Sequence, residues 1–188
     1  MIEKYFKYIL KKEDDTMFRL ATEVEAEKLN EIIIQAAKRI RKAGSKQWAG
    51  MLDGSAINEV REKINKREAY VWEVNNEIAG MLYASPIPSN WDKDMWGDKI
   101  MNPAYYIHRV AVPDGFQGKQ IPHNMLRDLQ KKNSNSVLRL DCVAHKEVLN
   151  RLYTEVGFVL VGVKEDYGRD GDQVVDFNLY EYHNETSL

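Results

Sequence analysis

Residues 105–122 constrain the fold of this chain more than any other segment. Residues 105–112 are a run of apolar and β-forming side chains, and they lead through a polar turn with two glycines into a helical pattern that begins at Ile121. A second strand-like run, residues 137–143, follows that helix. A strand, a crossover helix and a second strand in this order form a βαβ unit, so the sequence predicts two parallel strands in one sheet.

The start of that helix is also where the sequence predicts anion binding. A helix N-terminus carries amide groups without intrahelical partners and a partial positive charge, so phosphate docks there without a cationic pocket. In an α/β sheet the ligand site lies beyond the C-terminal ends of the parallel strands, which here means residues 112–122. Gln120 and Pro122 depart from the small residues expected in such a loop, and proline donates no hydrogen bond. Pro122 nevertheless fits the first turn of a helix.

The remaining patterns predict an α/β fold with a mixed, mainly antiparallel central sheet flanked by helices. The expected strands are 18–21, 69–74, 78–85, 104–112, 137–143, 157–163 and 174–182, and the expected helices are 22–43, 55–67, 121–133 and 146–156. Asn75 and Asn76 tolerate the positive φ angles of a tight hairpin turn between two of these strands.

Residues 86–103 are predicted as an unusually long loop, because they contain three prolines and no periodicity. Their three aspartates, Asp92, Asp94 and Asp98, would favour a cationic acceptor, although a solvated acidic loop explains them equally well. The loop tryptophans Trp48, Trp91 and Trp96 are open to two interpretations: walls of a substrate pocket, or packing of loops onto the sheet.

Length and composition indicate one domain. The chain has 188 residues, and we expect an N-terminal extension over 1–16, a single domain over 17–182 and a tail over 183–188. The net charge of -2 gives no electrostatic reason to expect nucleic acid. No apolar run approaches the ~18 residues of a membrane span, so no membrane partner is expected. Cys142 is the only cysteine, which suits a reducing cytoplasm.

Two segments together resemble the GNAT superfamily of acyl-CoA-dependent N-acetyltransferases. Residues 106–112 and 117–122 are similar to the family's strand and its Gln/Arg-x-x-Gly-x-Gly/Ala pyrophosphate loop. Residues 140–144 and 150–158 are similar to the next strand, the helix with a tyrosine, and the Gly-Phe pair that opens the following strand. The order of elements over 17–182 also fits. The resemblance implies a GNAT-like fold with a βαβ acyl-CoA-binding unit.

The resemblance further implies transfer of an acetyl group from acetyl-CoA to a primary amine of a small molecule or peptide, by direct attack on the thioester. Such an enzyme mainly positions two reactants and shields an oxyanion. The residues that would bind the co-substrate are Val110, Ala111, Val112, Gln117, Gly118, Lys119, Gln120, Ile121 and Lys146, the last standing where the family often has asparagine. A homodimer is common among similar proteins. No metal is expected, since Cys142 and His145 form a spacing without further ligands.

Tyr153 and His108 are the candidate catalytic residues. Tyr153 matches the tyrosine that protonates the departing thiolate in many family members, and a phenol with an ordinary pKa near ~10 is still protonated at pH 7. His108 stands about where many members place a glutamate that accepts the proton of the acceptor ammonium. A backbone N–H of Val110 or a neighbour would stabilise the oxyanion. The alternatives are a core-edge tyrosine and a structural histidine.

A second class of function stays open at this point. Because Gln120 and Pro122 replace small residues, the chain could be a noncatalytic GNAT-like module whose acyl-CoA site is degenerate and which acts through protein contacts. No local sequence pattern identifies the acceptor or the acyl chain length.

Overall fold

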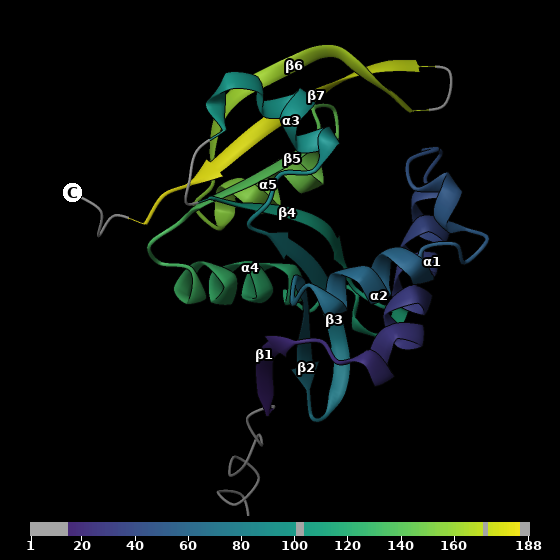
Figure 1. Cartoon of the computed structure of the whole chain (residues 1–188). Helices are drawn as coiled ribbons and strands as arrows, with labels where there is room; N and C mark the ends of the chain where they lie inside the picture. Colours follow the sequence, from purple (N-terminus) through teal and green to yellow (C-terminus); the bar gives the residue numbers. More distant parts are fainter. Residues whose placement is uncertain (1–14, 101–103, 171–172, 185–188) are drawn as a thin grey trace, which may run out of the picture.

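Seven strands form one sheet in the computed structural model, which describes residues 15–100, 104–170 and 173–184 (Figure 1). The strand order is β1-β2-β3-β4-β5-β7-β6. The strands are β1 (Thr16–Leu20), β2 (Ala69–Val74), β3 (Glu77–Ser85), β4 (Ala104–Ala111), β5 (Val137–Val143), β6 (Val159–Asp170) and β7 (Gln173–Tyr182). Only β4 and β5 pair in parallel, and the other neighbours are antiparallel. The predicted mixed, mainly antiparallel sheet is confirmed.

Five α-helices and four short 3₁₀ turns lie along the described part of the chain. The helices are α1 (Ala26–Lys42), α2 (Ile57–Asn65), α3 (Asn90–Trp96), α4 (Ile121–Lys132) and α5 (Glu147–Glu155). The 3₁₀ turns are η2 (Glu23–Glu25), η3 (Ala49–Met51), η4 (Gly97–Lys99) and η5 (Asp114–Phe116), η2 being held by a capping box between Thr22 and Glu25. The helix predicted from residue 22 therefore begins as a 3₁₀ turn, η2, and continues as α1.

The loop predicted over residues 86–103 is wrong for its central part, which forms α3 and η4. The local signal is a capping box, in which the Ser89 hydroxyl accepts a bond from the Asp92 amide while the Asp92 carboxylate accepts from the Ser89 amide. Met95 and Trp96 are buried. The Trp96 ring lies 4.7 Å from the guanidinium carbon of buried Arg139, so α3 is docked firmly on the sheet.

The last two strands are longer than predicted. β6 continues to Asp170, well beyond the expected end at residue 163. The extra residues are mostly polar and show no alternation of buried and exposed side chains, so their sequence alone does not indicate a strand. They are held instead by antiparallel pairing with β7. Of the predicted tail, His183 and Asn184 have no regular structure and the rest lies outside the described residues.

At the other end, β1 begins at Thr16, so the last residue of the predicted extension already pairs in the sheet. Residues 1–14 of that extension lie outside the described residues.

The helices cover the two faces of the sheet unequally. One face packs against α4 and α5 through a core that includes Leu126, Leu129 and Leu140. On the opposite face, α1 and α2 cover the half around β2 and β3, while α3 covers the half around β5 and β7. Figure 1 shows this division, with α1 and α2 together on one side and α3 beside β6 and β7. The middle of that face, over β4, therefore lies between two groups of helices.

Gly80 on β3 sets how closely the start of α4 approaches the sheet. A Cβ atom at this position would lie 2.8 Å from Cγ2 of Ile121 and 2.9 Å from Sδ of Met125. Both distances are too short for real contacts, so any larger residue would push α4 outward. The first turn of α4, where the sequence predicts anion binding, is thus positioned by the absence of a side chain on β3.

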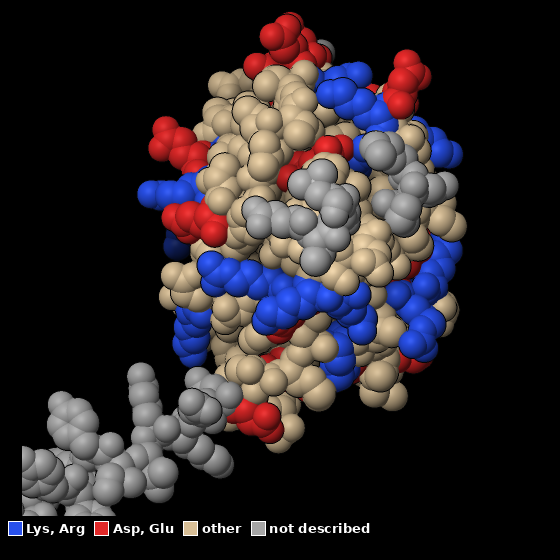
Figure 2. Space-filling view, turned by 90° about the vertical axis from the view of Figure 1, so that its left-hand side faces the viewer, with Lys and Arg blue, Asp and Glu red and all other residues tan. Residues whose placement is uncertain are grey.

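Charges of both signs are distributed over the surface. Figure 2 shows lysine and arginine side chains crossing one face in a band, with acidic side chains above and below it. The last turn of α4 contains Lys131 and Lys132, and cations at this end of a helix interact favourably with the helix dipole. Within the described residues, every helix is too short or too polar to cross a bilayer.

Candidate active site

β4 and β5 pair at their beginnings and then separate. The parallel pairing runs from Ala104 opposite Val137 to Tyr106 opposite Arg139, although both strands continue beyond it. We call the separated segments, residues 107–111 of β4 and 140–143 of β5, the fork. Backbone groups that point into the fork have no ladder partner on the facing strand, so they are available to a ligand.

β4 also carries a bulge inside the fork. Tyr83 on β3 opposes His108, and Met81 opposes Ala111, so β4 has one more residue than β3 between the two pairs. Arg109 in the bulge has a φ of 53°, a conformation that is uncommon for a residue with a side chain. A bulge leaves backbone groups unpaired and redirects neighbouring side chains. Val110, whose amide is the predicted oxyanion donor, lies in it.

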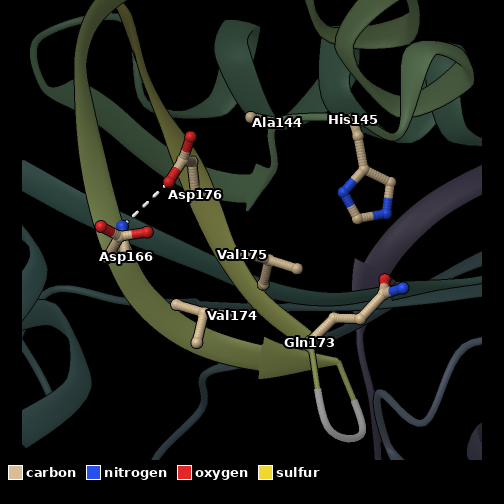
Figure 3. A pocket seen from close by; sticks show the side chains of 7 residues that line it. All are labelled: Ala144, His145, Asp166, Gln173, Val174, Val175 and Asp176. Atoms are coloured by element: carbon tan, nitrogen blue, oxygen red, sulfur yellow. Dashed lines mark hydrogen bonds between the residues drawn. The ribbon is translucent and has the colours of Figure 1, made fainter.

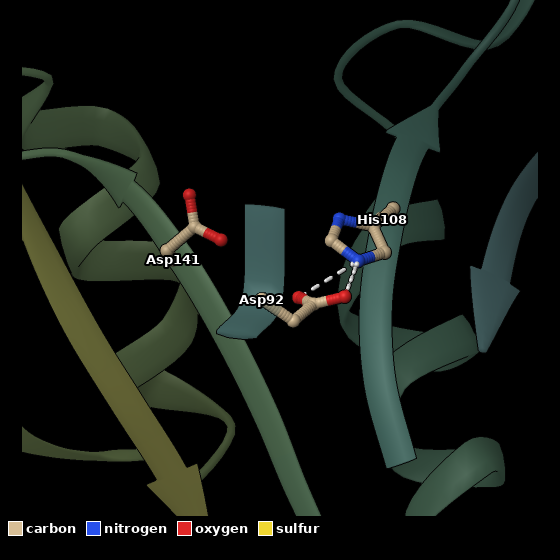
Figure 4. A group of neighbouring side chains, drawn as sticks. All are labelled: Asp92, His108 and Asp141. Atoms are coloured by element: carbon tan, nitrogen blue, oxygen red, sulfur yellow. Dashed lines mark hydrogen bonds and ion pairs between the residues drawn. The ribbon is translucent and has the colours of Figure 1, made fainter. Parts of the chain in front are cut away.

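His108 faces two aspartates across the fork (Figure 4). Its Nε2 lies 3.1 Å from both oxygens of Asp92 on α3. Asp141 on β5 approaches from the other wall, and one ligand atom from each of the three residues falls within 4.8 Å of the others. The side chain of Asp92 is 2% exposed and that of His108 24%. The fork therefore holds a compact cluster of one imidazole and two carboxyl groups.

The two carboxyl groups have opposite pKa shifts. Burial acts to raise the pKa of Asp92, but hydrogen bonds from His108 and Ser89 outweigh it and the pKa lies below its ordinary value. Burial raises the pKa of Asp141 above its ordinary value, against the opposing effect of the hydrogen bond from Trp91. Asp92 is thus a well-stabilised carboxylate. The positive charge around Asp141 does not compensate for the burial of its carboxylate.

Trp91 forms part of the wall beside Asp141. Its Nε1 donates a hydrogen bond to the Asp141 carboxylate at 3.1 Å. The ring packs edge to face against Tyr167 at 5.4 Å and Phe177 at 5.3 Å. Trp96 instead belongs to the core. Of the two interpretations of the tryptophans, the structure places Trp91 beside the cluster and Trp96 in packing.

Tyr153 on α5 reaches the opposite face of the same fork. It packs with Phe158 and Tyr180 in the core, and burial raises the pKa of its phenol well above the ordinary value, with further contributions from Cys142 and Asp141. The phenol is therefore protonated across the whole range in which proteins usually work, as an acid requires. His108 and Tyr153 lie on opposite faces of the sheet, each reaching toward residues of the fork.

Cys142 beside Tyr153 is a packing residue. Burial raises the pKa of its thiol to about 12, so the thiolate needed for nucleophilic or metal chemistry does not form near neutrality. Its Sγ lies 3.3 Å from Oδ1 of Asn150, which also accepts bonds from Asn178 and Tyr180 at 2.7 Å. The amide of Asn150 in turn donates to three carbonyls in the β5–α5 turn. Asn150 therefore fixes that turn relative to the fork.

The predicted pyrophosphate loop has the backbone shape of an anion site despite its departures. Gly118 has a φ of 74° and Gln120 a φ of 59°, so Gln120 adopts the left-handed conformation that a glycine would adopt. Gln120 is the N-cap of α4, and Pro122 lies in the first turn, as predicted, where a missing N–H costs little. The first amides of α4 have no partner inside the helix.

The side chains around this loop mainly hold its backbone in place by hydrogen bonds and an ion pair. Gln117 Nε2 donates to the Val112 carbonyl at 3.0 Å, and Arg39 donates to the same carbonyl at 2.6 Å and pairs with Asp114. The carbonyl of Val112, one of the predicted co-substrate residues, is therefore occupied. Ala111 pairs with Met81, so Val110 is the one of the three that lies in the bulge.

The two lysines among the predicted co-substrate residues, Lys119 and Lys146, contact different parts of the molecule. The Lys119 ammonium lies 4.8 Å from the centre of the Phe116 ring. It lines a cleft of about 350 Å³ with Trp72, Phe116, Ile121 and Asn124 among its walls. The Lys146 ammonium lies 3.5 Å from Asp170 on β6, so its charge is already engaged. Lys119 thus remains a cation beside the start of α4, whereas the charge of Lys146 is paired with Asp170.

A second set of polar groups lies on the α2 side of the fork. Arg109 extends over the Trp48 ring at 5.1 Å and reaches Glu59 at 3.3 Å. The Tyr83 hydroxyl and the Nε of Arg109 are buried without a hydrogen-bond partner in the described part of the chain. Buried groups of this kind are normally satisfied by water or a ligand.

The other open cleft, about 460 Å³, lies away from the cluster and the loop. Figure 3 shows that it is bounded by the β5–α5 turn, with Ala144 and His145, and by the β6–β7 hairpin. Asp166 and Asp176, which are joined through the Asp166 amide at 2.9 Å, line it too. None of the predicted site residues does.

Comparisons with known proteins agree with this architecture. The model of the acetyltransferase (GNAT) family matches residues 38–158. The uncharacterized N-acetyltransferase YesJ of Bacillus subtilis is 30% identical over 141 residues, which are 73% of this chain and 78% of that protein. The chain therefore belongs to the GNAT acetyltransferase family, and the resemblance seen in the sequence is confirmed.

Solved structures give the same assignment. A GNAT-family acetyltransferase from Listeria monocytogenes has 29% identity and a TM-score of 0.71, with 89% of this chain and 94% of that chain covered. The structure of yncA from Salmonella typhimurium with its cofactor acetyl-CoA has a TM-score of 0.64, with 90% and 94% covered. At 14% identity the second likeness shows the fold alone.

Sequence reasoning missed Asp141 and the partnership of Asp92 with His108. In the sequence, Asp92 stands out only as charge on a predicted loop, and Asp141 only as part of a strand motif. The Ser89-x-x-Asp92 spacing was available as a sign of α3. No sequence signal pairs a residue of α3 with one of β4, because that contact is made by the fold.

Proposed function

We propose that this GNAT-family acetyltransferase transfers an acetyl group from acetyl-CoA to the primary amine of a small molecule or peptide, by direct attack of the amine on the thioester. The observation that carries the proposal is the fork, which has an imidazole–carboxylate cluster on one face of the sheet and a protonated phenol on the other. A direct transfer needs a proton acceptor on the amine side and a proton donor on the thiol side.

The residues of the fork and the loop fit acetyl-CoA as the co-substrate. The left-handed Gln120 and the positive φ of Gly118 shape a loop in which the first amides of α4 meet the pyrophosphate. The unpaired backbone of Val110 in the bulge suits the thioester oxygen. Acetyl-CoA supplies the activated acetyl group, and the chain supplies position and proton transfer. We place this reaction in the cytoplasm, with no metal taking part.

Two roles are assigned to side chains. His108 accepts a proton from the acceptor, and Tyr153 donates one to the departing thiolate. Burial holds the pKa of Tyr153 above the ordinary value, so the phenol carries the proton that this role needs. Approach of the amine from the α3 face and of the thioester from the α4–α5 face keeps the two proton transfers apart.

The proposal is tested by calorimetric titration with acetyl-CoA, followed by an amine-panel assay in which release of the CoA thiol is the readout. We expect saturable binding and thiol release that depends on the amine. Absence of heat at millimolar acetyl-CoA would contradict the enzyme assignment and favour a noncatalytic module with a degenerate site. If acetyl-CoA binds but no amine causes thiol release, the co-substrate assignment stands and the assignment of an amine acceptor is refuted.

A further inference from the structure

Two consecutive residues of α3 reach the two walls of the fork. Trp91 bonds to Asp141 on β5, and Asp92 bonds to His108 on β4. α3 therefore fixes both the carboxyl group on one wall and the imidazole on the other. One helix therefore positions a side chain on each wall of the fork.

We propose that Asp141 binds the ammonium group of the acceptor, and that Asp92 is a positioning residue that orients His108 to take the proton from this ammonium. The proposal rests on the acetyl transfer proposed above and deepens it. It makes the acceptor an aliphatic amine that arrives charged, and it makes α3 the element that positions Asp141 and His108 to receive it.

The orientation of His108 follows from its bond to Asp92. Because Nε2 faces the Asp92 carboxylate, that nitrogen carries the hydrogen and Nδ1 is the nitrogen with a lone pair. Figure 4 shows the imidazole between the strand that carries it and the other two residues of the cluster. A carboxylate that holds one ring nitrogen and stabilises the imidazolium is a recurring arrangement for a base. Asp92 is fixed in turn by the Ser89 amide and hydroxyl at 2.8 and 2.6 Å.

Asp141 has the features of a cation-binding group. It receives a hydrogen bond from Trp91 through one oxygen only, and no lysine or arginine within the described residues forms an ion pair with it. Burial makes its charge costly until a cation arrives. The edge of Trp91 and the rings of Tyr167 and Phe177 form an apolar surface beside it. An ammonium group carried on an apolar chain matches this combination of a carboxylate and aromatic rings.

The proposed acetyl transfer balances in protons and electrons. The ammonium gives one proton to Nδ1 of His108, and the freed lone pair of the nitrogen forms the new bond to the acetyl carbon. The carbon–sulfur bond breaks, and the thiolate takes its electron pair and a proton from Tyr153. The nitrogen loses a second proton on collapse, which replaces the one given by Tyr153. His108 then releases its proton to water.

The experiment compares two isomeric probes, benzylamine and 4-methylaniline. Benzylamine is an ammonium at pH 7.5, whereas the arylamine is neutral there and has no proton to lose before it attacks. Each is assayed with acetyl-CoA by thiol release, and binding of benzylamine to the enzyme–CoA complex is measured by calorimetry. The variants are Asp141→Asn, Asp92→Asn and His108→Gln. Asp98→Asn, which changes an exposed aspartate just after α3, is the matched control.

We expect Asp141→Asn to raise the KM for benzylamine about 10- to 100-fold, the factor for losing a bond to a charged group, and to leave the arylamine nearly unchanged. We expect His108→Gln to lower kcat for benzylamine about 100-fold or more, and Asp92→Asn about 10-fold or more, both with a smaller effect on the arylamine. The acid limb of the pH profile should also move in Asp92→Asn. Asp92, Asp141 and Tyr83 are the titratable groups that face His108 from α3, β5 and β3.

A purely structural role gives a different pattern. If the variants reduce both probes equally, α3 only supports the fold and the proposal is overturned, although acetyl transfer stands. If acetyl-CoA binds but benzylamine neither binds nor reacts, the acceptor assignment fails while the CoA assignment stands. Circular dichroism melting of each variant separates a loss of folding from a loss of recognition. Because Asp92 caps α3, the Asp141 variant, which has no capping role, decides the case if Asp92→Asn unfolds.

The same cluster could hold a divalent cation, and the experiment distinguishes this. Its three ligand atoms are close enough together for one ion. Zn²⁺ and Mn²⁺ are therefore titrated into the wild type and the three variants. Stoichiometric metal binding that all three substitutions abolish, together with acetyl transfer that a chelator stops, would overturn the amine assignment. Unchanged turnover in the chelator supports it.

Discussion

Tyr153 packs in the core, and in the proposed reaction the same side chain also acts as the acid. Its ring lies 6.3 Å from that of Phe158 and 5.8 Å from that of Tyr180, so the ring belongs to the core. The sequence left the two roles as alternatives, but the structure makes them compatible. The burial that packs the ring is also what keeps the phenol protonated.

Tyr153→Phe should therefore separate the two roles. The ring is retained, so the melting temperature should change little, while kcat should fall about 100-fold or more because the acid is lost. The raised pKa means that the wild-type phenol does not ionise near the ordinary value of ~10. Ionisation of Tyr153 should therefore cause no decline in wild-type kcat up to that pH. Kinetics from pH 6 to 10 check both points.

Tyr105→Phe is the matched control, since Tyr105 is a partly buried tyrosine of β4 that packs on the same core before the fork. It should retain full activity. Equal turnover of wild type and Tyr153→Phe across the pH range would remove the acid assignment even if acetyl transfer stands.

At the scale of elements, the loop before α4 shows how a departure in sequence can leave the backbone unchanged. Gln120 stands where a small residue is expected, yet it takes the left-handed conformation itself. That conformation costs a non-glycine residue about 1–2 kcal/mol. The sequence predicts where the loop before α4 lies, but it could not show whether the backbone would tolerate the glutamine.

Gln120→Gly should raise the free energy of unfolding by about 1 kcal/mol, because the strain of the left-handed conformation is relieved. It should leave acetyl-CoA affinity equal or improved, since the amides stay in place. Gly118→Ala is the opposite test: its φ of 74° strains any side chain, so stability and affinity should both fall. Urea unfolding and calorimetric titration measure the two effects. A loss of affinity in Gln120→Gly would mean that the glutamine side chain itself binds the co-substrate.

The docking of α4 on β3 gives a second test at this scale. Gly80→Ala should destabilise the fold by about 1–3 kcal/mol, because the new methyl group overlaps Ile121 and Met125. Since Ile121 is the first residue of α4, the displacement should also weaken acetyl-CoA binding. Gly50→Ala is the control, because a Cβ there meets nothing within 4 Å and φ is not positive. If Gly80→Ala binds acetyl-CoA as well as Gly50→Ala, the approach of α4 does not set the site.

For the molecule as a whole, the local patterns were sufficient for the strand order of the βαβ unit and for the loop, because both depend on neighbours in sequence. They were insufficient for α3, where a short helix of seven residues has little periodicity. They could not place Asp141 opposite His108 either. Those residues lie on strands that pair only at their beginnings, so the cluster exists only once the sheet has separated at the fork.

The fork divides the sheet into two parts, β1 to β4 and β5 to β7, that share three paired positions. A ligand in the fork should therefore stabilise the whole molecule by joining them. At a concentration about 100 times its Kd, acetyl-CoA should add ~2.7 kcal/mol, which at about 2–4 °C per kcal/mol corresponds to a melting temperature about 5–10 °C higher.

Hydrogen exchange tells where this stabilisation acts. We expect acetyl-CoA to slow amide exchange in residues 107–111 and 140–143, in addition to the loop before α4, while β1 and β2 in the same sample stay nearly unchanged. Protection of both walls would show that the ligand spans the fork, because each wall belongs to a different part of the sheet. Protection confined to the loop would mean that the nucleotide end binds while the thioester does not enter, and His108 and Tyr153 would then lose their substrate.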